Sequence, residues 1–300
     1  MKWLALIAAA LAPFSAFSQS VPRESYSKPD LLIEPSDLAC PDTGRQFVVL
    51  DARSREAYDL GHIPGARHVN HDAWKDAFGD GQDREGWGRR IGELGIGPDS
   101  KIVVYDDAGM KNAGRVWWIL HYWGVNDARL LNGSWRGWQA ENLPISKESP
   151  EAKPAEFHAE PKAGLLATKQ DVLAFLRDPR WQILDSRSRN EYCGIDKAKN
   201  KRGGAMPRAK HLEWSDLVDQ QTHRFKAPQE IRRLMDQAGI DLARPIATHC
   251  QTGGRSSVMA FGLELMGAKD VRNYYRGWNE WGNEESTPVV VPEEGKEKSE

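Results

Sequence analysis

The 300-residue sequence has three cysteines, almost no net charge and no long hydrophobic run. A formal net charge of −2 and the lack of a long basic stretch argue against a nucleic-acid-binding protein or a polybasic membrane contact. The histidines do not stand at metal-ligand spacings, so no metal site is expected. With 40% hydrophobic and 28% charged residues, the chain can form two ordinary domains. Its expected partners are small anions.

The N-terminus has the pattern of a secretory signal peptide. A short basic start, Met1–Trp3, precedes the apolar run Leu4–Ala12, which is too short to span a membrane. We expect residues 1–18 to be removed by cleavage near Ser18 and the mature protein to be periplasmic or secreted. No cysteine stands near this point, so a lipid anchor is not expected; an uncleaved anchor is the weaker alternative.

The three cysteines allow either one disulfide with a free thiol or three free thiols. Cys40 and Cys193 are the only candidate structural pair, and the sequence leaves that bridge open. Cys250 is the thiol that we expect to be reactive.

Cys250 follows an apolar run and begins a glycine-bearing loop, Cys-Gln-Thr-Gly-Gly-Arg, that leads into a predicted helix near Ser256. The amides of Gln251, Thr252, Gly253, Gly254 and Arg255 would then lack strand partners and could turn toward the sulfur. Such donors and a neighbouring cation lower cysteine pKa values from ~8.5 to roughly 3.5–7.5. The loop therefore predicts an anion cradle around a thiolate; the alternative is a buried structural cysteine.

An internal repeat divides the chain. Four segments recur in the same order: Val48–Tyr58 as Gln182–Tyr192, Gly61–His68 as Gly204–His211, Lys101–Asp106 as Pro245–Cys250, and Arg136–Trp138 as Arg276–Trp278. A lysine-rich insertion, 196–202, interrupts the second copy. The order of the matches indicates a duplication.

Each repeat alternates short buried strands with helical stretches, which predicts an α/β fold with a parallel sheet flanked by helices. We expect domain 1 over residues 19–143, an exposed linker rich in Pro, Glu, Lys and Ala over 144–163, domain 2 over 164–288 and a charged tail over 289–300.

These motifs in combination resemble the tandem-domain sulfurtransferases of the rhodanese family. The resemblance rests on the Asp-x-Arg segments, Gly-His-Ile-Pro-Gly-Ala, the Cys250 loop and the Arg-Gly-Trp element. It covers nearly the whole chain after residue 18. It implies two rhodanese-like domains, of which the second is catalytic.

The resemblance implies a two-step reaction without cofactor, in which the Cys250 thiolate takes a sulfur from an anionic donor and passes the resulting persulfide sulfur to a thiol or cyanide-like acceptor. Arg187 and Arg255, with the loop residues, would bind the donor. A purely structural ion pair is the alternative for Arg187. Asp185 is expected to bind backbone donors, and His249 to point away from the loop.

In the first repeat Asp106 takes the place of Cys250, so this half cannot form a persulfide. We expect it to line the active-site cleft and pack on domain 2. Remnant donor binding by Arg53 or Arg115 is the weaker alternative. The histidines His62, His68 and His211 and most of the twelve tryptophans are expected to be structural.

The sequence indicates the identity of the sulfur donor less directly. Thiosulfate enzymes of the family often carry Cys-Arg-Lys-Gly-Val-Thr, whereas 3-mercaptopyruvate enzymes often carry Cys-Gly-Ser-Gly-Val-Thr and an extra arginine where this chain has Cys193. Thiosulfate is therefore the favoured donor, and 3-mercaptopyruvate the alternative. A cysteine-dependent phosphatase or arsenate reductase is disfavoured because such loops place five residues between Cys and Arg. A non-catalytic binding module would not need Cys250 and its loop.

Overall fold

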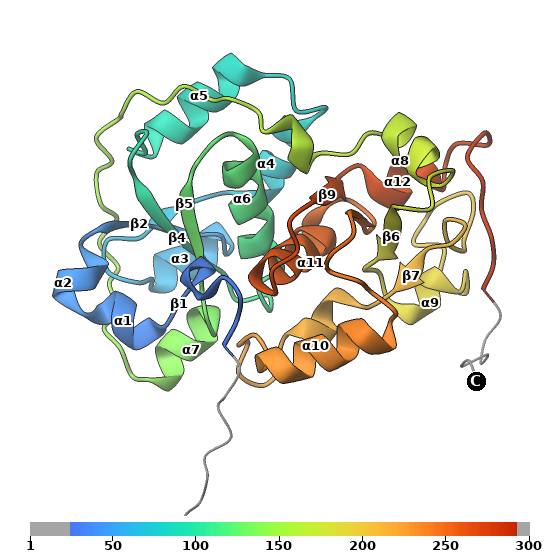
Figure 1. The fold of residues 1–300 in the computed structure, drawn as a ribbon. Helices are drawn as coiled ribbons and strands as arrows, with labels where there is room; N and C mark the ends of the chain where they lie inside the picture. Colours follow the sequence, from blue (N-terminus) through green and yellow to red (C-terminus); the bar gives the residue numbers. More distant parts are fainter. Residues whose placement is uncertain (1–24, 293–300) are drawn as a thin grey trace, which may run out of the picture.

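The computed structural model describes residues 25–292, which form two domains side by side (Figure 1). The signal peptide predicted over residues 1–18 and the tail beyond residue 292 lie outside the described residues. Domain 1 contains η1 (Pro29–Leu31), β1 (Leu32–Ile33), α1 (Pro35–Ala39), α2 (Pro41–Gly44), β2 (Phe47–Asp51), α3 (Arg55–Leu60), β3 (Arg67–His68), α4 (His71–Phe78), α5 (Arg84–Glu93), β4 (Lys101–Tyr105), α6 (Lys111–Tyr122), β5 (Asp127–Leu131) and α7 (Ser134–Ala140).

Domain 2 repeats this pattern with fewer helices. It contains η2 (Ala163–Leu165), α8 (Lys169–Phe175), β6 (Gln182–Asp185), α9 (Arg189–Tyr192), β7 (Lys210–His211), η3 (Trp214–Leu217), α10 (Pro228–Gln237), β8 (Ile246–His249), α11 (Gly254–Leu265), β9 (Val271–Tyr274) and α12 (Gly277–Trp281).

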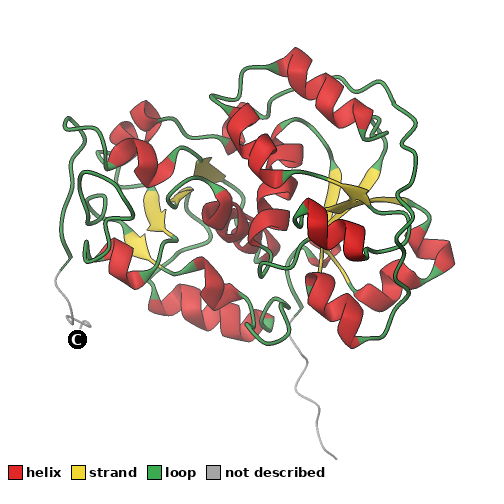
Figure 2. Ribbon diagram, turned by 180° about the vertical axis from the view of Figure 1, so that it is seen from behind, coloured by secondary structure: helices red, strands yellow, loops and turns green. Residues whose placement is uncertain are grey.

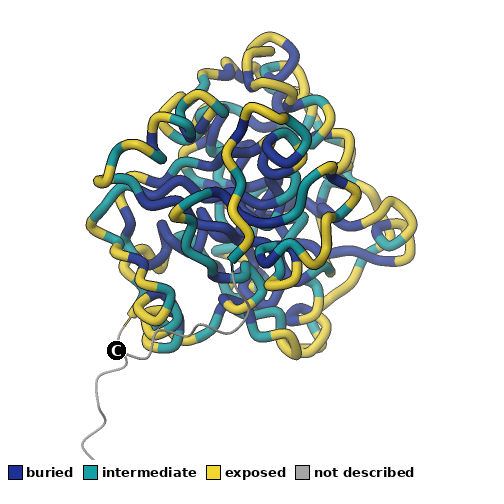
Figure 3. The backbone as a smooth tube through the Cα atoms, turned by 90° about the vertical axis from the view of Figure 1, so that its right-hand side faces the viewer, coloured by how far each residue is buried: buried dark blue, intermediate teal, exposed yellow. Residues whose placement is uncertain are grey.

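Both sheets are parallel throughout, which confirms the predicted α/β fold. The five strands of domain 1 lie in the order β1-β5-β4-β2-β3, and the four strands of domain 2 in the order β7-β6-β8-β9. Helices cover the strands, which lie in the interior of each domain (Figure 2). The central strands are apolar because parallel strands are buried on both faces; every residue of β8 is buried, and the tube coloured by burial shows the same for the middle of each domain (Figure 3).

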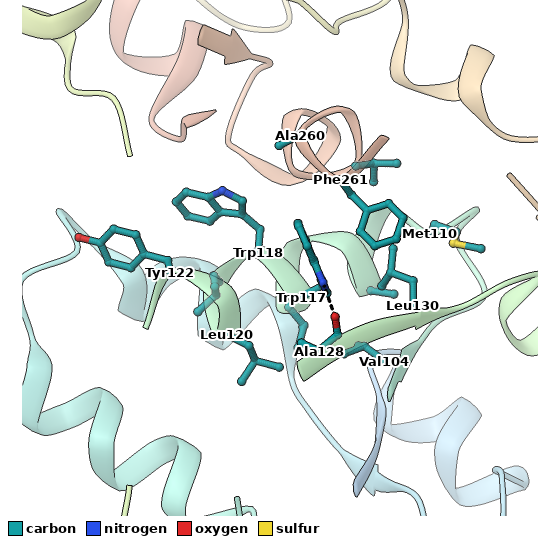
Figure 4. Close-up of a cluster of buried hydrophobic side chains, with 14 of the residues drawn as sticks. Val104, Met110, Trp117, Trp118, Leu120, Tyr122, Ala128, Leu130, Ala260 and Phe261 are labelled. Carbon is teal, nitrogen blue, oxygen red and sulfur yellow. Dashed lines mark hydrogen bonds between the residues drawn. The ribbon is translucent and has the colours of Figure 1, made fainter. Parts of the chain in front are cut away.

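The interface between the two domains is an apolar core. Helices α6 and α11 pack against each other with Gly114 against Val258, where a Cβ on Gly114 would come within 2.7 Å of a Val258 methyl. The Trp117 ring meets Phe261 edge-on at 4.8 Å (Figure 4), and Phe78 lies 4.6 Å from the Tyr275 ring. Most of the tryptophans are buried here and in the domain cores, as predicted.

Two predicted boundaries and the predicted exposure of the linker need correction. Residues 25–28, assigned to domain 1, lie on domain 2, because the Tyr26 hydroxyl donates to the Lys226 carbonyl at 2.6 Å and the Lys28 amide to Leu265 at 3.1 Å. The linker is mostly exposed, but Phe157 and Ala159 are buried against domain 1. The tail predicted from residue 289 starts too early, since Val290 exchanges two backbone hydrogen bonds with Ala205.

One match of the internal repeat was wrong by three residues. The Trp278 amide donates to the carbonyl of Cys250, and in domain 1 the amide that reaches Asp106 belongs to Trp135 rather than Trp138. Gly277 and Ser134 share a positive φ at this point, of 56° and 54°. Both segments read Arg-Gly-Trp, so their sequence similarity suggested that Trp138 corresponds to Trp278. In the structure, Trp135 corresponds to Trp278.

In the part of the chain that the structure describes, no helix is long and apolar enough to cross a bilayer.

Candidate active site

Cys250 lies where strand β8 ends at the carboxyl edge of its sheet, and it is 1% exposed. Asp185 at the end of the neighbouring β6 stands opposite His249, so the Asp-x-Arg segment and the cysteine loop meet at the same edge. Parallel α/β sheets place ligands at this edge. The three cysteines are unbridged in the structure, and Cys193 is buried while Cys40 is exposed.

Hydrogen-bond donors surround the sulfur. The Ser256 hydroxyl lies 3.5 Å from Cys250 Sγ, and the amides of Thr252 and Ser256 also stabilise the thiolate. Burial raises the pKa of the Cys250 thiol, but the Arg255 charge and these hydrogen bonds outweigh burial and bring the pKa below its ordinary value. Of the amides predicted to face the sulfur, Thr252 supplies one, and the second comes from Ser256. Ser256 was not among the predicted site residues.

Arg255 supplies the cation of the loop, and Glu191 fixes its position. Its two terminal nitrogens reach the two Glu191 carboxylate oxygens at 2.5 and 2.8 Å, a bidentate pair. Glu191 is buried and also forms a capping box with Ser188 at the start of α9. Glu191 was not among the predicted site residues, although Ser-x-x-Glu after a strand is the signature of such a cap.

Different structural constraints require glycine at positions 253 and 254 of the loop. Gly253 precedes α11 with a φ of +86°, and a Cβ there would come within 2.4 Å of the Tyr275 ring. Gly254 has no positive φ; a Cβ there would meet the guanidinium of Arg115 at 2.5 Å. A positive φ thus accounts for the glycine at position 253 only, and close packing accounts for the one at position 254.

Arg115 reaches the loop from domain 1. Its Nη1 donates to the Thr252 carbonyl and to the Tyr275 hydroxyl, both at 3.0 Å, and the side chain is buried. With its carbonyl held outward, Thr252 can turn its amide toward the sulfur. Arg115 therefore contacts the cradle through Thr252, a contact that the sequence did not predict.

Arg187 is part of a buried ion pair. It is 1% exposed, its Nε and Nη2 bind Asp185, and Nη2 also donates to the Gly204 carbonyl at 2.7 Å. Its guanidinium lies over Trp278 at 4.1 Å. This geometry favours the structural alternative over direct contact with a donor. Arg53 and Asp51 form the same arrangement over Trp135 in domain 1.

His249 points to the side of Asp185, as expected, with 3.6 Å between its Nε2 and the carboxylate. Burial lowers the pKa of His249 to about 4, so the ring is neutral near pH 7. His68 and His211 each bond the carbonyl of the Asp-x-Arg arginine in their own domain, at 3.0 and 2.8 Å. These histidines have the structural roles that were expected.

In domain 1, Asp106 stands at the position equivalent to Cys250. The Asp106 carboxylate accepts hydrogen bonds from four backbone amides, at 2.8 to 3.1 Å, and from Ser134. The Asp106 side chain thus takes up the backbone donors that would otherwise face a bound sulfur species.

A cavity of about 280 Å³ borders the Cys250 loop between the domains. Thr252, Tyr275 and Asn279 line it from domain 2, and domain 1 contributes residues that include Lys75. This agrees with the expectation that domain 1 lines the cleft. A larger hollow of about 650 Å³ between α5 and the linker has no residue of the loop in its lining. Among residues 25–292 no three acidic, histidine or cysteine side chains gather as metal ligands would.

The family model of the Rhodanese-like domain matches residues 35–141 and 168–284. The chain belongs to the rhodanese-like family. Both copies of the rhodanese-like domain coincide with the two sheets described above, so the predicted tandem architecture is confirmed.

Several sulfurtransferases of this family are similar over most of the chain. A thiosulfate sulfurtransferase of Azotobacter vinelandii is 34% identical, over 89% of this chain and 100% of its own. A 3-mercaptopyruvate sulfurtransferase of Homo sapiens is 30% identical, over 87% and 93%. Among solved structures, an anaerobic ergothioneine biosynthesis enzyme from Chlorobium limicola shares the fold, with a TM-score of 0.79 and 24% identity over 91% of this chain and 73% of its own.

Proposed function

We propose that the protein is a sulfurtransferase that moves a sulfane sulfur from an anionic donor to a thiophilic acceptor through a persulfide on Cys250. The observation that carries the proposal is the buried thiol at the end of β8, surrounded by amides, a hydroxyl and a cation. Sulfurtransferases among the relatives, at 30 to 34% identity, support the same activity.

In the first step the Cys250 thiolate attacks the outer sulfur of the donor. With thiosulfate, the S–S bond of the donor breaks, sulfite leaves with the electron pair, and the enzyme keeps the sulfur as a persulfide anion. The donors that stabilise the thiolate then stabilise this anion, because the negative charge stays within the same ring of amides. An acceptor nucleophile attacks the outer sulfur in the second step and regenerates the thiolate.

Thiosulfate is the favoured donor. The 3-mercaptopyruvate branch is expected to carry an arginine at the position of Cys193, and Cys193 is a buried cysteine here. Relatives of both kinds exist at similar identity, so their names do not decide between the donors. A single-turnover measurement with each donor distinguishes them. We expect faster persulfide formation with thiosulfate than with 3-mercaptopyruvate at equal concentration. A faster reaction with 3-mercaptopyruvate would assign the protein to the other branch.

Export is a further part of the proposal, supported by the basic start, apolar run and small residues of the first eighteen positions. The N-terminal sequence of the protein recovered from the producing cell tests it. A mature start near Gln19 is expected, and an intact Met1 would contradict cleavage.

A further inference from the structure

The segment Ile195–Lys201 has no counterpart in domain 1. There, Gly61 follows helix α3 directly and accepts a hydrogen bond from Arg53 at 2.7 Å. The equivalent carbonyl in domain 2 is that of Gly204, which Arg187 reaches at the same distance. The added residues form the loop between α9 and β7, at the right-hand side of Figure 1.

This added loop is fixed to the residue that follows the nucleophile. The amide groups of Asn200 and Gln251 exchange two hydrogen bonds, at 3.0 and 3.2 Å. Asn283 donates to Asn200 Oδ1 at 2.9 Å and accepts from the Lys201 amide at the same distance. Asn200 is buried. The loop therefore has a defined position at the edge of the Cys250 cradle.

Three lysines project from this anchored loop. Lys197, Lys199 and Lys201 are all exposed, and within residues 25–292 none of them forms an ion pair. Ile195 beside them is 59% exposed. Asp196 is the acidic residue of the same loop, and it accepts a bond from the Ala198 amide at 2.7 Å. The surface is thus basic with an apolar contact point.

We propose that Ile195–Lys201 is the docking surface for the acidic face of a peptide or protein that accepts sulfur from Cys250. The inference rests on the proposed sulfurtransferase function. Because Cys250 is 1% exposed, a large acceptor can reach the sulfur only with a thiol on a protruding segment, while its body rests on the surface around the loop. A small dianion such as thiosulfate fits within the neighbouring cavity and needs no such surface.

The transfer itself balances without further reactants. The acceptor thiolate attacks the outer sulfur of the Cys250 persulfide, a new S–S bond forms on the acceptor, and the enzyme S–S bond breaks. Cys250 leaves as the thiolate, the form that its surroundings stabilise, and the charge of the persulfide anion moves with the outer sulfur to the acceptor. The lysines take no part in this step; they raise the rate of productive encounter with a carboxylate-rich partner.

The test uses two cysteine peptides, Asp-Glu-Cys-Glu-Asp and its neutral analogue Asn-Gln-Cys-Gln-Asn. The enzyme is first charged with thiosulfate, and the rate of sulfur loss is then measured by mass for the wild type and for K197Q/K199Q/K201Q. A matched control, K147Q/K153Q/K269Q, removes three exposed lysines elsewhere. Each variant is compared with the wild type using the same peptide, so that differences in peptide thiol pKa cancel.

We expect the loop variant to discharge to the acidic peptide about tenfold more slowly, with the neutral peptide and the control variant unchanged. The difference should disappear in about 0.5 M salt, where exposed charges are screened. Equal rates for the loop variant and the wild type, or equal slowing with both peptides, would overturn the docking inference. If the wild type takes up no sulfur at all, the proposed function fails instead.

Discussion

At the scale of single residues, the site depends on which donors face one sulfur atom. Ser256 and the neighbouring Ser257 are both buried, and both contact the Gly253 carbonyl and the Asn273 side chain. Of the two hydroxyls, that of Ser256 also lies 3.5 Å from Cys250 Sγ. This difference gives a matched pair of substitutions in which only one changes the environment of the thiolate.

Ser256→Ala should raise the pKa of Cys250 by about 1 to 2 units, because a hydrogen bond to a charged group is worth about 1.5–3 kcal/mol. Reaction with iodoacetamide as a function of pH measures this pKa. At pH 6 the variant should react more slowly than the wild type, and at high pH equally fast. Ser257→Ala is the control and should keep the wild-type profile; an unchanged profile for Ser256→Ala would refute the role of this hydroxyl.

Residue-level reasoning from the sequence found the nucleophile and its loop but not all of their partners. Cys250, Gly253 and Arg255 were identifiable because their chemistry is contiguous in the chain. Glu191 was missed because its pairing with Arg255 depends on two strand ends meeting. Arg187 was assigned a substrate contact by resemblance, although an Asp two residues before an arginine already suggests the ion pair that the structure contains.

At the scale of elements, domain 1 contacts the Cys250 loop through helix α6. This helix presents Gly114 to α11 and Arg115 to the cradle, on adjacent positions. No pattern within either repeat predicts the second contact, because it joins segments from different domains. The sequence pattern also did not reveal the correct register of the repeat. The equivalence of Trp135 and Trp278 follows from their hydrogen bonds to Asp106 and Cys250.

Arg115→Met should slow persulfide formation at least about tenfold, because a displaced loop no longer aligns its amides on the sulfur. The pKa of Cys250 from the alkylation profile should rise at the same time. Trp117→Phe, which alters the interface at Phe261 but not the loop, serves as the control. If Arg115→Met lowers the melting temperature while leaving the alkylation profile unchanged, Arg115 is a stabilising residue only. Partial recovery in Arg115→Lys would support the positioning role.

At the scale of the whole molecule, one continuous apolar core joins both domains. The sequence predicted two domains and their fold because each repeat carries its own strand and helix pattern. It could not predict how tightly they join, since that depends on Gly114, Trp117 and Phe261 meeting across the interface. It also could not show that residues 25–28 pack on domain 2 rather than on domain 1.

The buried histidine His249 predicts acid sensitivity of the fold. Its folded-state pKa of about 4 lies below the ordinary value of 6.5, so the unfolded chain binds this proton more readily. The contribution of neutral His249 to the free energy of unfolding is fully present above pH 6.5. It decreases by up to about 3 kcal/mol as the pH drops toward 4. The urea midpoint measured at pH 7, 5.5 and 4.5 tests this.

Domain 1 suggests the variant for this test, because Tyr105 occupies the equivalent position and its hydroxyl bonds the Asp51 carboxylate. His249→Tyr should therefore lose less stability than the wild type between pH 6.5 and 4.5. An identical decline in both proteins would mean that other groups cause the acid sensitivity.

The persulfide on Cys250 is the central claim, and intact-protein mass measurement after incubation with thiosulfate tests it most directly. The account predicts a gain of one sulfur atom, about 32 Da, that disappears when a thiol acceptor is added. Cys250→Ser should show no gain, and Cys40→Ser and Cys193→Ser should behave like the wild type. A gain that survives in Cys250→Ser, or no gain with either thiosulfate or 3-mercaptopyruvate in the wild type, would contradict the account.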